Sequence, residues 1–345
     1  MDVKGKIINL RKHGKTVFAD IYDGINRTQL MIPRVEYDEI PFNKGEFLVV
    51  CGEMTKSRKG NSVLVPSDYR TIMSPQHYVG EDFTNRRELI GKSKLLSIVR
   101  TNLIDKGFVE TVTPHLLTHP GNSNIVPFET ETREHTRAYL RYTLEIELKK
   151  ASSRTQLPLF EIGNVFRNMG IARTHPTHEY TIVEGIWPYA SLEDGMSLCE
   201  SIFREAASLH GQDFSEIPCR NIKEALDSTS KTDQRTVYKK GIRLVEAPTF
   251  FSNPPYEWSP LSISNEDGTA KDSELVFRNV GLAHICEEEN NYDKLLEKLG
   301  LNGNEKMRER IDPLFLEAIR SGMPPSVGFC IGIDRMLWKL REGEG

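Results

Sequence analysis

The sequence lacks several features that would assign it to a class of protein at once. Its longest apolar run, FLVVCG at residues 47–52, is far shorter than the roughly 20 residues that a membrane-crossing helix needs. None of its five cysteines forms a C-x-x-C pair, which argues against a zinc site or a disulfide framework. The first residues, MDVKGKIINL, do not show the basic, apolar and small-residue order of a signal peptide. We therefore expect a cytoplasmic protein with reduced thiols.

The sequence also lacks a positive net charge, an internal repeat and a low-complexity tract. Its formal net charge of −4 does not indicate nucleic-acid binding, which only a local basic surface could support. Its 38% hydrophobic and 27% charged residues are ordinary for a globular protein. At 345 residues the chain is long enough for one large domain or for two.

Residues 1–75 predict a small β domain. Short runs of alternating apolar and polar residues are broken by His13-Gly14 and by the turn signal Asp23-Gly24. Two further runs, EFLVVCGEM and NSVLVPS, flank the basic turn KSRKG. Five short strands with basic turns fit a barrel of the oligonucleotide-binding type. On the strand pattern alone, any other small β barrel with solvated turns is the simpler interpretation.

Residues 76–90 are polar and predict a linker, and residues 91–345 predict a second, larger domain. Between Leu89 and Asp105 apolar residues recur at helical spacing. Long strands that do not alternate regularly with helices favour an α+β domain with a mostly antiparallel sheet. The predicted strands lie near residues 158–166, 180–187, 274–286 and 326–333, and the predicted helices near residues 194–210, 293–300 and 311–321.

The segment VFRNMGIARTHPTHEYTIVEG, residues 165–185, places basic side chains between two predicted strands. Arg167 leaves the first strand, and Arg173 and His175 follow on the loop. This arrangement predicts a pocket for an anion, because the arginine fork suits phosphate oxygens. Tyr180, at the start of the second strand, offers an aromatic face for a base. Taken alone, a basic turn exposed to solvent is the simpler interpretation.

The C-terminal segment GMPPSVGFCIGIDRMLWKL predicts a strand that leads into a helix. Gly328 and Gly332 lie within the apolar strand, and glycine inside a strand indicates that another group approaches the backbone closely. Arg335 stands at the start of the helix, where free N–H groups favour a phosphate. The alternative is a glycine bulge with a structural arginine.

Together these segments resemble a known family. FRN followed by EYT-x-x-E, and GIGIDR preceded by GMPP, resemble motifs 2 and 3 of the class II aminoacyl-tRNA synthetases. RTNLIDKGFVETVTPHLL resembles their motif 1, which implies a homodimer with its interface around Pro114. The resemblance is to subclass IIb, the lysyl, aspartyl and asparaginyl enzymes, and runs from Lys4 to Leu340. It implies an N-terminal oligonucleotide-binding barrel that reads the tRNA anticodon, followed by an antiparallel sheet flanked by helices.

Within the subclass, the lysyl branch is the most similar. AYLRYTLEIELKK resembles the lysyl pattern LR-x-x-x-EL-x-LK, whereas the other branches usually carry glutamine near the place of Glu145. By that resemblance Glu145 binds the substrate α-amino group, and Glu184 and Glu288 face the side-chain ammonium of lysine. Paired carboxylates would offset the desolvation of that ammonium, although a solvated acidic run remains the alternative around Glu288. The resemblance adds Gly121 and Arg167 to the amino-acid-binding residues, with Arg167 on the substrate carboxylate.

The resemblance implies that ATP and Mg²⁺ take part in the reaction. Arg167 and Arg335 would be the catalytic residues, Arg167 neutralising the α-phosphate and Arg335 holding the γ-phosphate. Tyr180 would stack on adenine, and Glu274 would be the metal ligand. The residues that the resemblance assigns to ATP are Arg167, Arg173, His175, Tyr180, Glu274, Gly332 and Arg335.

The predicted barrel also carries residues that match the subclass. Arg11, Phe18 and Gln29 fall where subclass IIb enzymes contact the central uridine of the anticodon. One aromatic ring to stack on a base and two polar side chains to read its edge suit single-stranded RNA. Each residue taken singly could equally be an ordinary surface residue of a barrel.

Three positions depart from the family pattern. Met169 stands where motif 2 normally has glutamate, and Gly281 stands where a Mg²⁺-binding glutamate is expected. Cys330 replaces a glycine of motif 3 beside the nucleotide. Losing one carboxylate weakens the neutralisation of the departing pyrophosphate. These departures raise the possibility of a specialised paralogue.

The leading hypothesis from the sequence is ATP-dependent activation of an amino acid, favouring lysine or a lysine-like amino acid, and its transfer to tRNA. A second hypothesis keeps the adenylation but transfers the amino acid to another acceptor, a protein, a peptide or a small molecule. An enzyme of the aspartyl or asparaginyl type is a further alternative. A non-catalytic tRNA-binding protein is the least favoured, because the arginines of motifs 2 and 3 are both retained.

Overall fold

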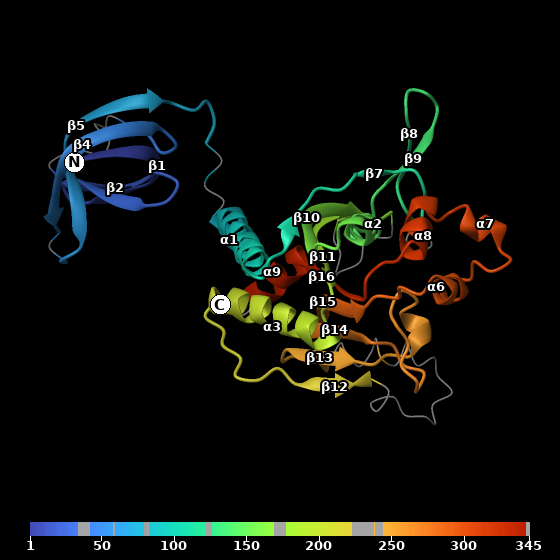
Figure 1. The fold of residues 1–345 in the computed structure, drawn as a ribbon. Coiled ribbons are helices and arrows are strands. Elements are labelled where there is room, and N and C mark those ends of the chain that lie inside the picture. The colour runs from blue at the N-terminus through green and yellow to red at the C-terminus, as the bar shows by residue number, and fades with distance from the viewer. Residues whose placement is uncertain are drawn as a thin grey trace. The chain divides into compact units, whose positions relative to one another are not determined.

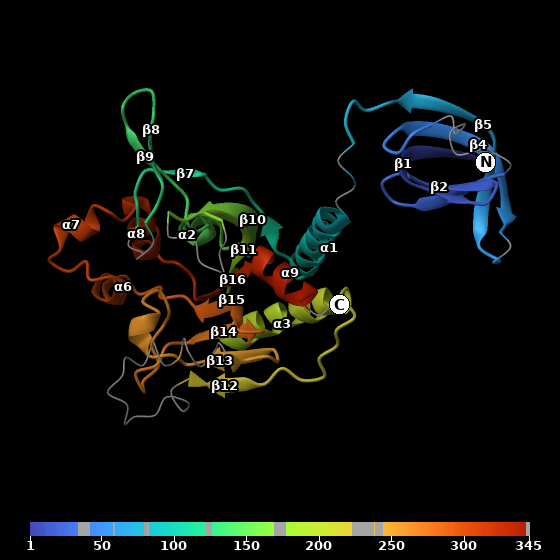
Figure 2. The same cartoon turned by 180° about the vertical axis from the view of Figure 1, so that it is seen from behind.

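The computed structural model describes residues 1–33, 42–57, 59–78, 80, 83–121, 126–168, 177–222, 238 and 244–342. The chain divides into two compact units, Met1–Arg87 and Glu88–Gly345. Figures 1 and 2 show the elements of both units from opposite sides. Each unit is described by itself below.

The first unit contains a closed five-stranded β barrel, as the sequence predicted, and its strand order is β1-β2-β3-β5-β4. The turns after β1 and β2 contain Gly14 and Gly24, both with positive φ, which explains the turn signals at these points. Side chains that alternate along the strands, such as Ala19 and Ile21, fill the interior of the barrel. The strands are β1 (Asp2–His13), β2 (Thr16–Tyr22), β3 (Arg27–Pro33), β4 (Phe47–Lys56) and β5 (Ser62–Met73).

The second unit is built on an eight-stranded sheet with the order β12-β13-β14-β15-β16-β11-β10-β6. Its neighbouring strands are antiparallel except for the two outermost pairs, β12 with β13 and β10 with β6. The predicted α+β fold with a mostly antiparallel sheet is therefore confirmed. The strands of the unit are β6 (Val109–Glu110), β7 (Leu116–Leu117), β8 (Glu129–Glu131), β9 (Arg137–Leu140), β10 (Leu159–Phe166), β11 (Glu179–Pro188), β12 (Cys219–Asn221), β13 (Thr249–Ser252), β14 (Asp272–Phe277), β15 (Val280–Glu287) and β16 (Ser326–Gly332).

Helices cover both faces of this sheet (Figure 1). On one face α1, α3 and α9 pack around side chains such as Phe160 and Val183. On the other face α2, α6 and α8 pack around Ile182 and Ile186. The helices are α1 (Phe83–Asp105), α2 (Glu145–Thr155), α3 (Leu192–Ser208), α6 (Tyr292–Lys298), α7 (Glu305–Arg308), α8 (Pro313–Arg320) and α9 (Ile333–Arg341), with a short 3₁₀ turn, η3 (Tyr256–Trp258).

Alternation along β11 decides which face carries the chemistry. Val183 points into the core under α3 and α9, so Ile182 and Ile186 point to the α2 face. Glu184 lies between these two isoleucines and shares their face. The carboxylate that the sequence singled out therefore lies under the first residues of α2.

Two elements differ from their predictions. The predicted strand at 274–286 is a hairpin, because Arg278 and Asn279 adopt positive φ and reverse the chain between β14 and β15. Residues 83–90 of the predicted linker belong to helix α1. This first part of α1 is rich in charged residues with good helix propensity, which a search for apolar periodicity does not detect.

None of the described helices has both the length and the apolar composition to span a membrane.

Candidate active site

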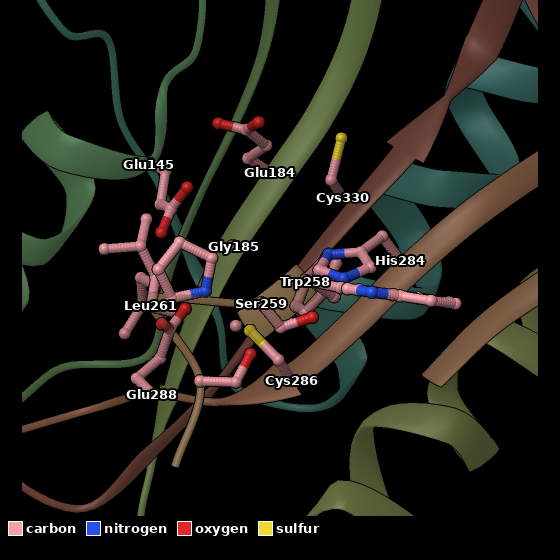
Figure 3. A pocket seen from close by; sticks show the side chains of 15 residues that line it. Glu145, Glu184, Gly185, Trp258, Ser259, Leu261, His284, Cys286, Glu288 and Cys330 are labelled. Atoms are coloured by element: carbon pink, nitrogen blue, oxygen red, sulfur yellow. The ribbon is translucent and has the colours of Figure 1, made fainter. Parts of the chain in front are cut away.

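A cavity of about 190 Å³ opens on the α2 face of the sheet and is lined by acidic and aromatic side chains. Figure 3 shows His284 and Trp258 across this cavity from Glu145. A wider cavity of about 600 Å³ shares Glu145, Glu184 and His284 with it. The wider cavity is also lined by Gly121, Arg167 and Arg335. The fold thus brings together residues that the sequence separates by more than half of the chain.

Glu184 is buried at the edge of both cavities and is held by the start of helix α2. Its carboxylate accepts hydrogen bonds from the hydroxyl of Thr143 (2.9 Å) and from the backbone N–H of Leu144 (2.5 Å). Burial, reinforced by the nearby charge of Glu145, raises the pKa of Glu184 to about 7. An ammonium placed beside this carboxylate would offset the penalty that burial puts on its charge.

Lys149 lies buried behind two carboxylates of the smaller cavity, Glu145 and Glu288, and the sequence did not predict it. Its ammonium lies 2.5 Å from a carboxylate oxygen of Glu145 and 2.6 Å from one of Glu288, and its side chain is only 2% exposed. Burial opposes the charge of Lys149, but attraction by the two carboxylates outweighs it and raises its pKa. The carboxylate that the resemblance assigns to a substrate ammonium, Glu288, therefore already faces an ammonium of the chain itself.

The position of Glu288 depends on a glycine in the neighbouring strand. A Cβ atom on Gly328 of β16 would lie 1.8 Å from Oε1 of Glu288. The carboxylate therefore occupies the space that any side chain at this position would fill. This agrees with the expectation that a glycine inside the strand marks a close approach to the backbone.

His284 lines both cavities from strand β15. Its Nε2 atom lies 2.7 Å from Oδ2 of the buried Asp272. Partial burial opposes the charge of His284, whose side chain is 51% exposed, but the charge and hydrogen bond of Asp272 outweigh it and raise the pKa of His284 to about 9. Across the strand pair, Cys330 of β16 lies opposite His284. Burial, together with the charge of Glu184, raises the pKa of the Cys330 thiol well above its usual value.

The two arginines reach the wider cavity from different elements. Arg167 directly follows β10, between β10 and β11, and its guanidinium lies 5.2 Å from the ring centre of Tyr180. Arg335 lies in the first turn of α9, next to Gly332. A Cβ atom on Gly332 would lie 2.7 Å from Nε of Arg335, so the glycine leaves room for this side chain. Both cations therefore face the same space, as an anion site requires.

Gly121 closes another part of the wider cavity. It has a φ of +75°, and a Cβ atom there would lie 1.6 Å from the hydroxyl oxygen of Tyr142. Its backbone N–H donates to the carbonyl of Arg310 at 2.9 Å. Any other residue at this position would displace Tyr142 and narrow the cavity.

Comparison with known families accounts for this combination of sheet, barrel and motifs. A family model described as "tRNA synthetases class II (D, K and N)" matches residues 79–344.

The chain belongs to this class II synthetase family.

The match confirms the family that the motifs predicted and makes the chain a ligase of the class II synthetase type. A second family model, described as an OB-fold nucleic acid binding domain, matches residues 2–72 and confirms the nature of the barrel.

Curated relatives of this synthetase cover nearly the whole chain at low identity. The chain is 26% identical to the lysine--tRNA ligase of Saccharolobus solfataricus, over 96% of this chain and 83% of the relative. It is 27% identical to the lysine--tRNA ligase of Enterococcus faecalis, over 100% of this chain and 84% of the relative. It is also 26% identical to the lysylphosphatidylglycerol biosynthesis bifunctional protein LysX of Rhodococcus jostii, over 99% of this chain and 38% of that protein.

Class II synthetases use ATP and typically a divalent metal, and Glu274 is the residue to which the sequence assigned the metal. Its carboxylate accepts a hydrogen bond from the hydroxyl of Tyr238 at 2.9 Å. A Cβ atom on Gly281 would lie 1.9 Å from its Oε1, so Glu274 fills the space beside the glycine that replaces the expected second glutamate. Within the described ranges, no three histidine, cysteine or acidic residues are grouped to hold a metal ion. A single carboxylate fits only an ion that arrives with the ATP phosphates, which supply most of its ligands.

Three residues that the sequence singled out lie outside the described residues. They are Met169, Arg173 and His175, all within residues 169–176.

In the barrel of the synthetase, two of the three predicted anticodon residues contact Asp20. Arg11 and Gln29 donate to this carboxylate at 3.2 Å and 3.4 Å. Phe18 packs edge-to-face against His13, with ring centres 6.0 Å apart. Sequence reasoning missed Asp20, although an acidic residue between the apolar Ala19 and Ile21 marks an outward position on the strand.

Proposed function

We propose that this synthetase activates an amino acid with a cationic side chain, lysine or a lysine-like amino acid, and transfers it to tRNA. The similarity to lysine--tRNA ligases and the OB-fold domain both support the proposal. The charge of the small cavity is the observation that carries it.

The charge of the cavity suits a substrate with two ammonium groups. Glu145, Glu184 and Glu288 contribute three carboxylates, and Lys149 behind them contributes one positive charge. The cationic His284 is paired with the carboxylate of Asp272, so these groups together leave two negative charges at the cavity. The α-ammonium and the side-chain ammonium of a diamino acid would balance them. A neutral or acidic side chain would leave a buried carboxylate without a countercharge, which is strongly unfavourable.

The proposed first step needs no nucleophile from the chain. The substrate carboxylate attacks the α-phosphorus of ATP in line, the bond to the bridging oxygen breaks, and pyrophosphate leaves. Arg167 would neutralise the α-phosphate and orient the carboxylate, and Arg335 would hold the γ-phosphate. The ring of Tyr180 would stack on adenine and also contact the guanidinium of Arg167. Glu274 would hold a Mg²⁺ ion that, when bound with ATP, neutralises charge on the phosphates.

In the second step, a terminal hydroxyl of tRNA attacks the carbonyl carbon of the adenylate and releases AMP. The barrel would bind the anticodon through Arg11, Phe18 and Gln29. The proposal includes a cytoplasmic location, where ATP and tRNA are found. It also includes a homodimer formed through the segment around Pro114, which is exposed in the structure.

A second candidate function keeps the activation step and changes the acceptor. The replacement of a metal-binding glutamate by Gly281 and the similarity to LysX favour it. In that case the adenylate would react with an amine or hydroxyl of a protein, a peptide or a small molecule. An aspartyl or asparaginyl type of enzyme suits the cavity less well, because its substrate would not balance the two negative charges.

The test is amino-acid-dependent ATP–pyrophosphate exchange, followed by charging of total tRNA. We expect exchange with lysine and not with norleucine, which has the same carbon chain but lacks the side-chain amine. If no amino acid supports exchange, both candidate functions are contradicted. If an amino acid supports exchange but tRNA is not charged, only the first function, transfer to tRNA, is contradicted. Arg335→Ala should lower the exchange rate by about 100-fold or more. Arg154→Ala, the same change at an exposed position in the last turn of α2, should leave it unchanged.

A further inference from the structure

The outer surface of the barrel contains a buried carboxylate surrounded by four donors. Asp20 lies on β2 between Ala19 and Ile21, whose side chains fill the barrel interior, so Asp20 points outward. It is nevertheless only 1% exposed, because side chains of the two neighbouring strands cover it. The cluster consists of Asn9 and Arg11 from β1 and Arg27 and Gln29 from β3, in addition to Asp20.

The strand register places these side chains next to one another. Asn9 lies directly opposite Asp20 on β1, and Gln29 lies directly opposite it on β3. Oδ2 of Asp20 accepts from Arg27 at 2.5 Å, from Asn9 at 3.1 Å and from Arg11 at 3.2 Å. A single carboxylate thus ties together side chains from three strands.

The cluster remains charged and leaves donors pointing to solvent. Burial opposes the charge of Asp20, but the hydrogen bonds of Arg27 and Asn9 and the charges of the two arginines outweigh it, so its pKa is lowered. Arg11 and Arg27 are 46% and 56% exposed, which leaves part of each guanidinium accessible. Two arginines and one carboxylate give the cluster a net charge of about +1 at neutral pH.

An aromatic side chain adjoins the cluster. Phe18 lies directly opposite Arg11 in the register and two residues before Asp20 on the same face of β2. An aromatic ring beside oriented guanidinium and amide donors suits an unpaired base, which stacks on the ring and presents its edge to the donors.

We propose that Asp20 is a positioning residue for RNA recognition, which holds Arg11, Arg27 and Gln29 in the orientation that distinguishes one base from another. The inference rests on the proposed tRNA partner and extends it. Asp20 itself repels phosphates, so its presence lowers the overall affinity for RNA while it raises base selectivity. A residue that merely stabilised the barrel would not have this double effect.

The test measures binding of the full chain to four hairpin RNAs that differ only in the central base of the loop. Asp20→Asn removes the negative charge and keeps the size of the side chain. We expect it to reduce the preference among the four bases by about tenfold, because the donors lose their fixed orientation. We also expect tighter binding to the three RNAs with the other bases at low salt, and for all four RNAs a salt-dependence slope steeper by about 0.7–0.9, the contribution of one charge.

Glu53→Gln is the matched control. Glu53 is an exposed carboxylate on β4, and this variant changes the net charge of the barrel by the same amount. It should keep the base preference of the wild type. Arg27→Lys provides a second variant that retains the charge and replaces the planar fork, so it should lose selectivity without a change in the salt slope.

Unchanged base preference in Asp20→Asn would overturn the inference, and so would weaker binding to all four RNAs without a steeper salt slope. If Asp20→Asn does not fold, retained selectivity in Arg27→Lys would overturn it in the same way. If the wild type itself shows no base preference, the proposed anticodon-reading role fails together with the inference. ATP–pyrophosphate exchange reports separately on amino-acid activation.

Discussion

The carboxylates of the smaller cavity differ in the groups that neutralise them. Glu145 and Glu288 share the ammonium of Lys149, whereas Glu184 accepts hydrogen bonds from the uncharged Thr143 hydroxyl and Leu144 N–H. Hydrogen bonds of this kind compensate a buried charge less completely than an ammonium does. Glu184 is therefore the carboxylate that gains most from a cationic substrate.

The raised pKa of Glu184 predicts a pH dependence of stability. The pKa is about 7 in the folded protein and 4.5 for an ordinary glutamate. Between these values the folded state holds a proton that the unfolded state has lost, so unfolding becomes easier as the pH rises from 4.5 to 7. We expect the free energy of unfolding of the wild type to fall by about 3 kcal/mol relative to that of Glu184→Gln as the pH rises across this range. Thermal unfolding of both proteins at a series of pH values measures this difference.

Saturating lysine is the control for this pH effect. A bound ammonium favours the charged form of Glu184, so lysine should stabilise the wild type more at pH 8 than at pH 5. A difference between wild type and Glu184→Gln that does not change with pH would contradict the assigned ionisation.

Lys149 offers a second prediction at the residue scale. Lys149→Met would leave Glu145 and Glu288 buried without their shared cation, and we expect it to lower the free energy of unfolding by about 3–5 kcal/mol. Adding Glu288→Gln should restore a large part of this loss, because only one of the two carboxylates then remains. Urea unfolding of both single variants and the double variant gives the coupling directly. Strictly additive effects would contradict the ion-pair network.

The residues that line the cavities could be predicted from the sequence where they belong to a local motif. Arg167, Glu145, Glu184 and Arg335 stand in such motifs and do line the cavities. Lys149, like Asp20 in the barrel, was not predicted, because the partners of a buried charge are chosen by the fold. Lys149 stands four residues after Glu145 in α2, but nothing local indicates that Glu288, directly after β15, would approach it.

At the scale of elements, the central strands position the cavity through their glycines. Strand β16 lies between β11 and β15, so it runs between the strands that carry Glu184 and His284. Gly328 lets the carboxylate of Glu288 lie against this strand. The absence of a side chain at Gly328 therefore helps to shape the smaller cavity.

Gly328→Ala should weaken amino-acid binding more than it weakens the fold. Its Cβ would lie 1.8 Å from Oε1 of Glu288 and would force the carboxylate to move. We expect the KM for lysine in pyrophosphate exchange to rise by about tenfold or more, which corresponds to the loss of one charged contact. Gly91→Ala in α1, where the nearest heavy atom to a Cβ is the flexible Leu337 at 3.1 Å, should keep the wild-type KM. Equal effects of the two substitutions would contradict the role given to Gly328.

Elements were predictable where the hydrophobic pattern was clear. The strands at β10, β11 and β16 and the end of α1 at Asp105 follow their patterns. The hairpin between β14 and β15 was hidden because its turn residues, Arg278 and Asn279, interrupt the apolar run without a glycine. Turn chemistry of this kind becomes visible only when the backbone angles are known.

At the scale of the whole molecule, an exposed apolar strip marks the segment that resembles motif 1. Val109, Val112 and Leu116 are 45%, 79% and 53% exposed. Apolar side chains gathered on one short segment are typical of a surface that another molecule covers. A second copy of the chain is the partner that the family resemblance implies.

Val112→Glu should separate the proposed dimer. We expect the wild type to sediment at about twice the chain mass of 39.3 kDa and the variant to sediment as a monomer, because a charge in an apolar interface is costly. Ile25→Glu places the same charge on another exposed apolar side chain, in the barrel, and should leave the dimer intact. A wild type that is monomeric at micromolar concentration would contradict the proposed assembly.

The cavity thiols have a practical consequence for labelling. All five cysteines are free, and among them Cys330 and Cys286 line the smaller cavity. Burial, with nearby carboxylates, raises the pKa of both thiols well above the usual value, so they hold little of the thiolate that reacts with maleimides. The exposed Cys219 is the preferred attachment point for a fluorescent dye. A dye there would leave the walls of the cavity chemically intact.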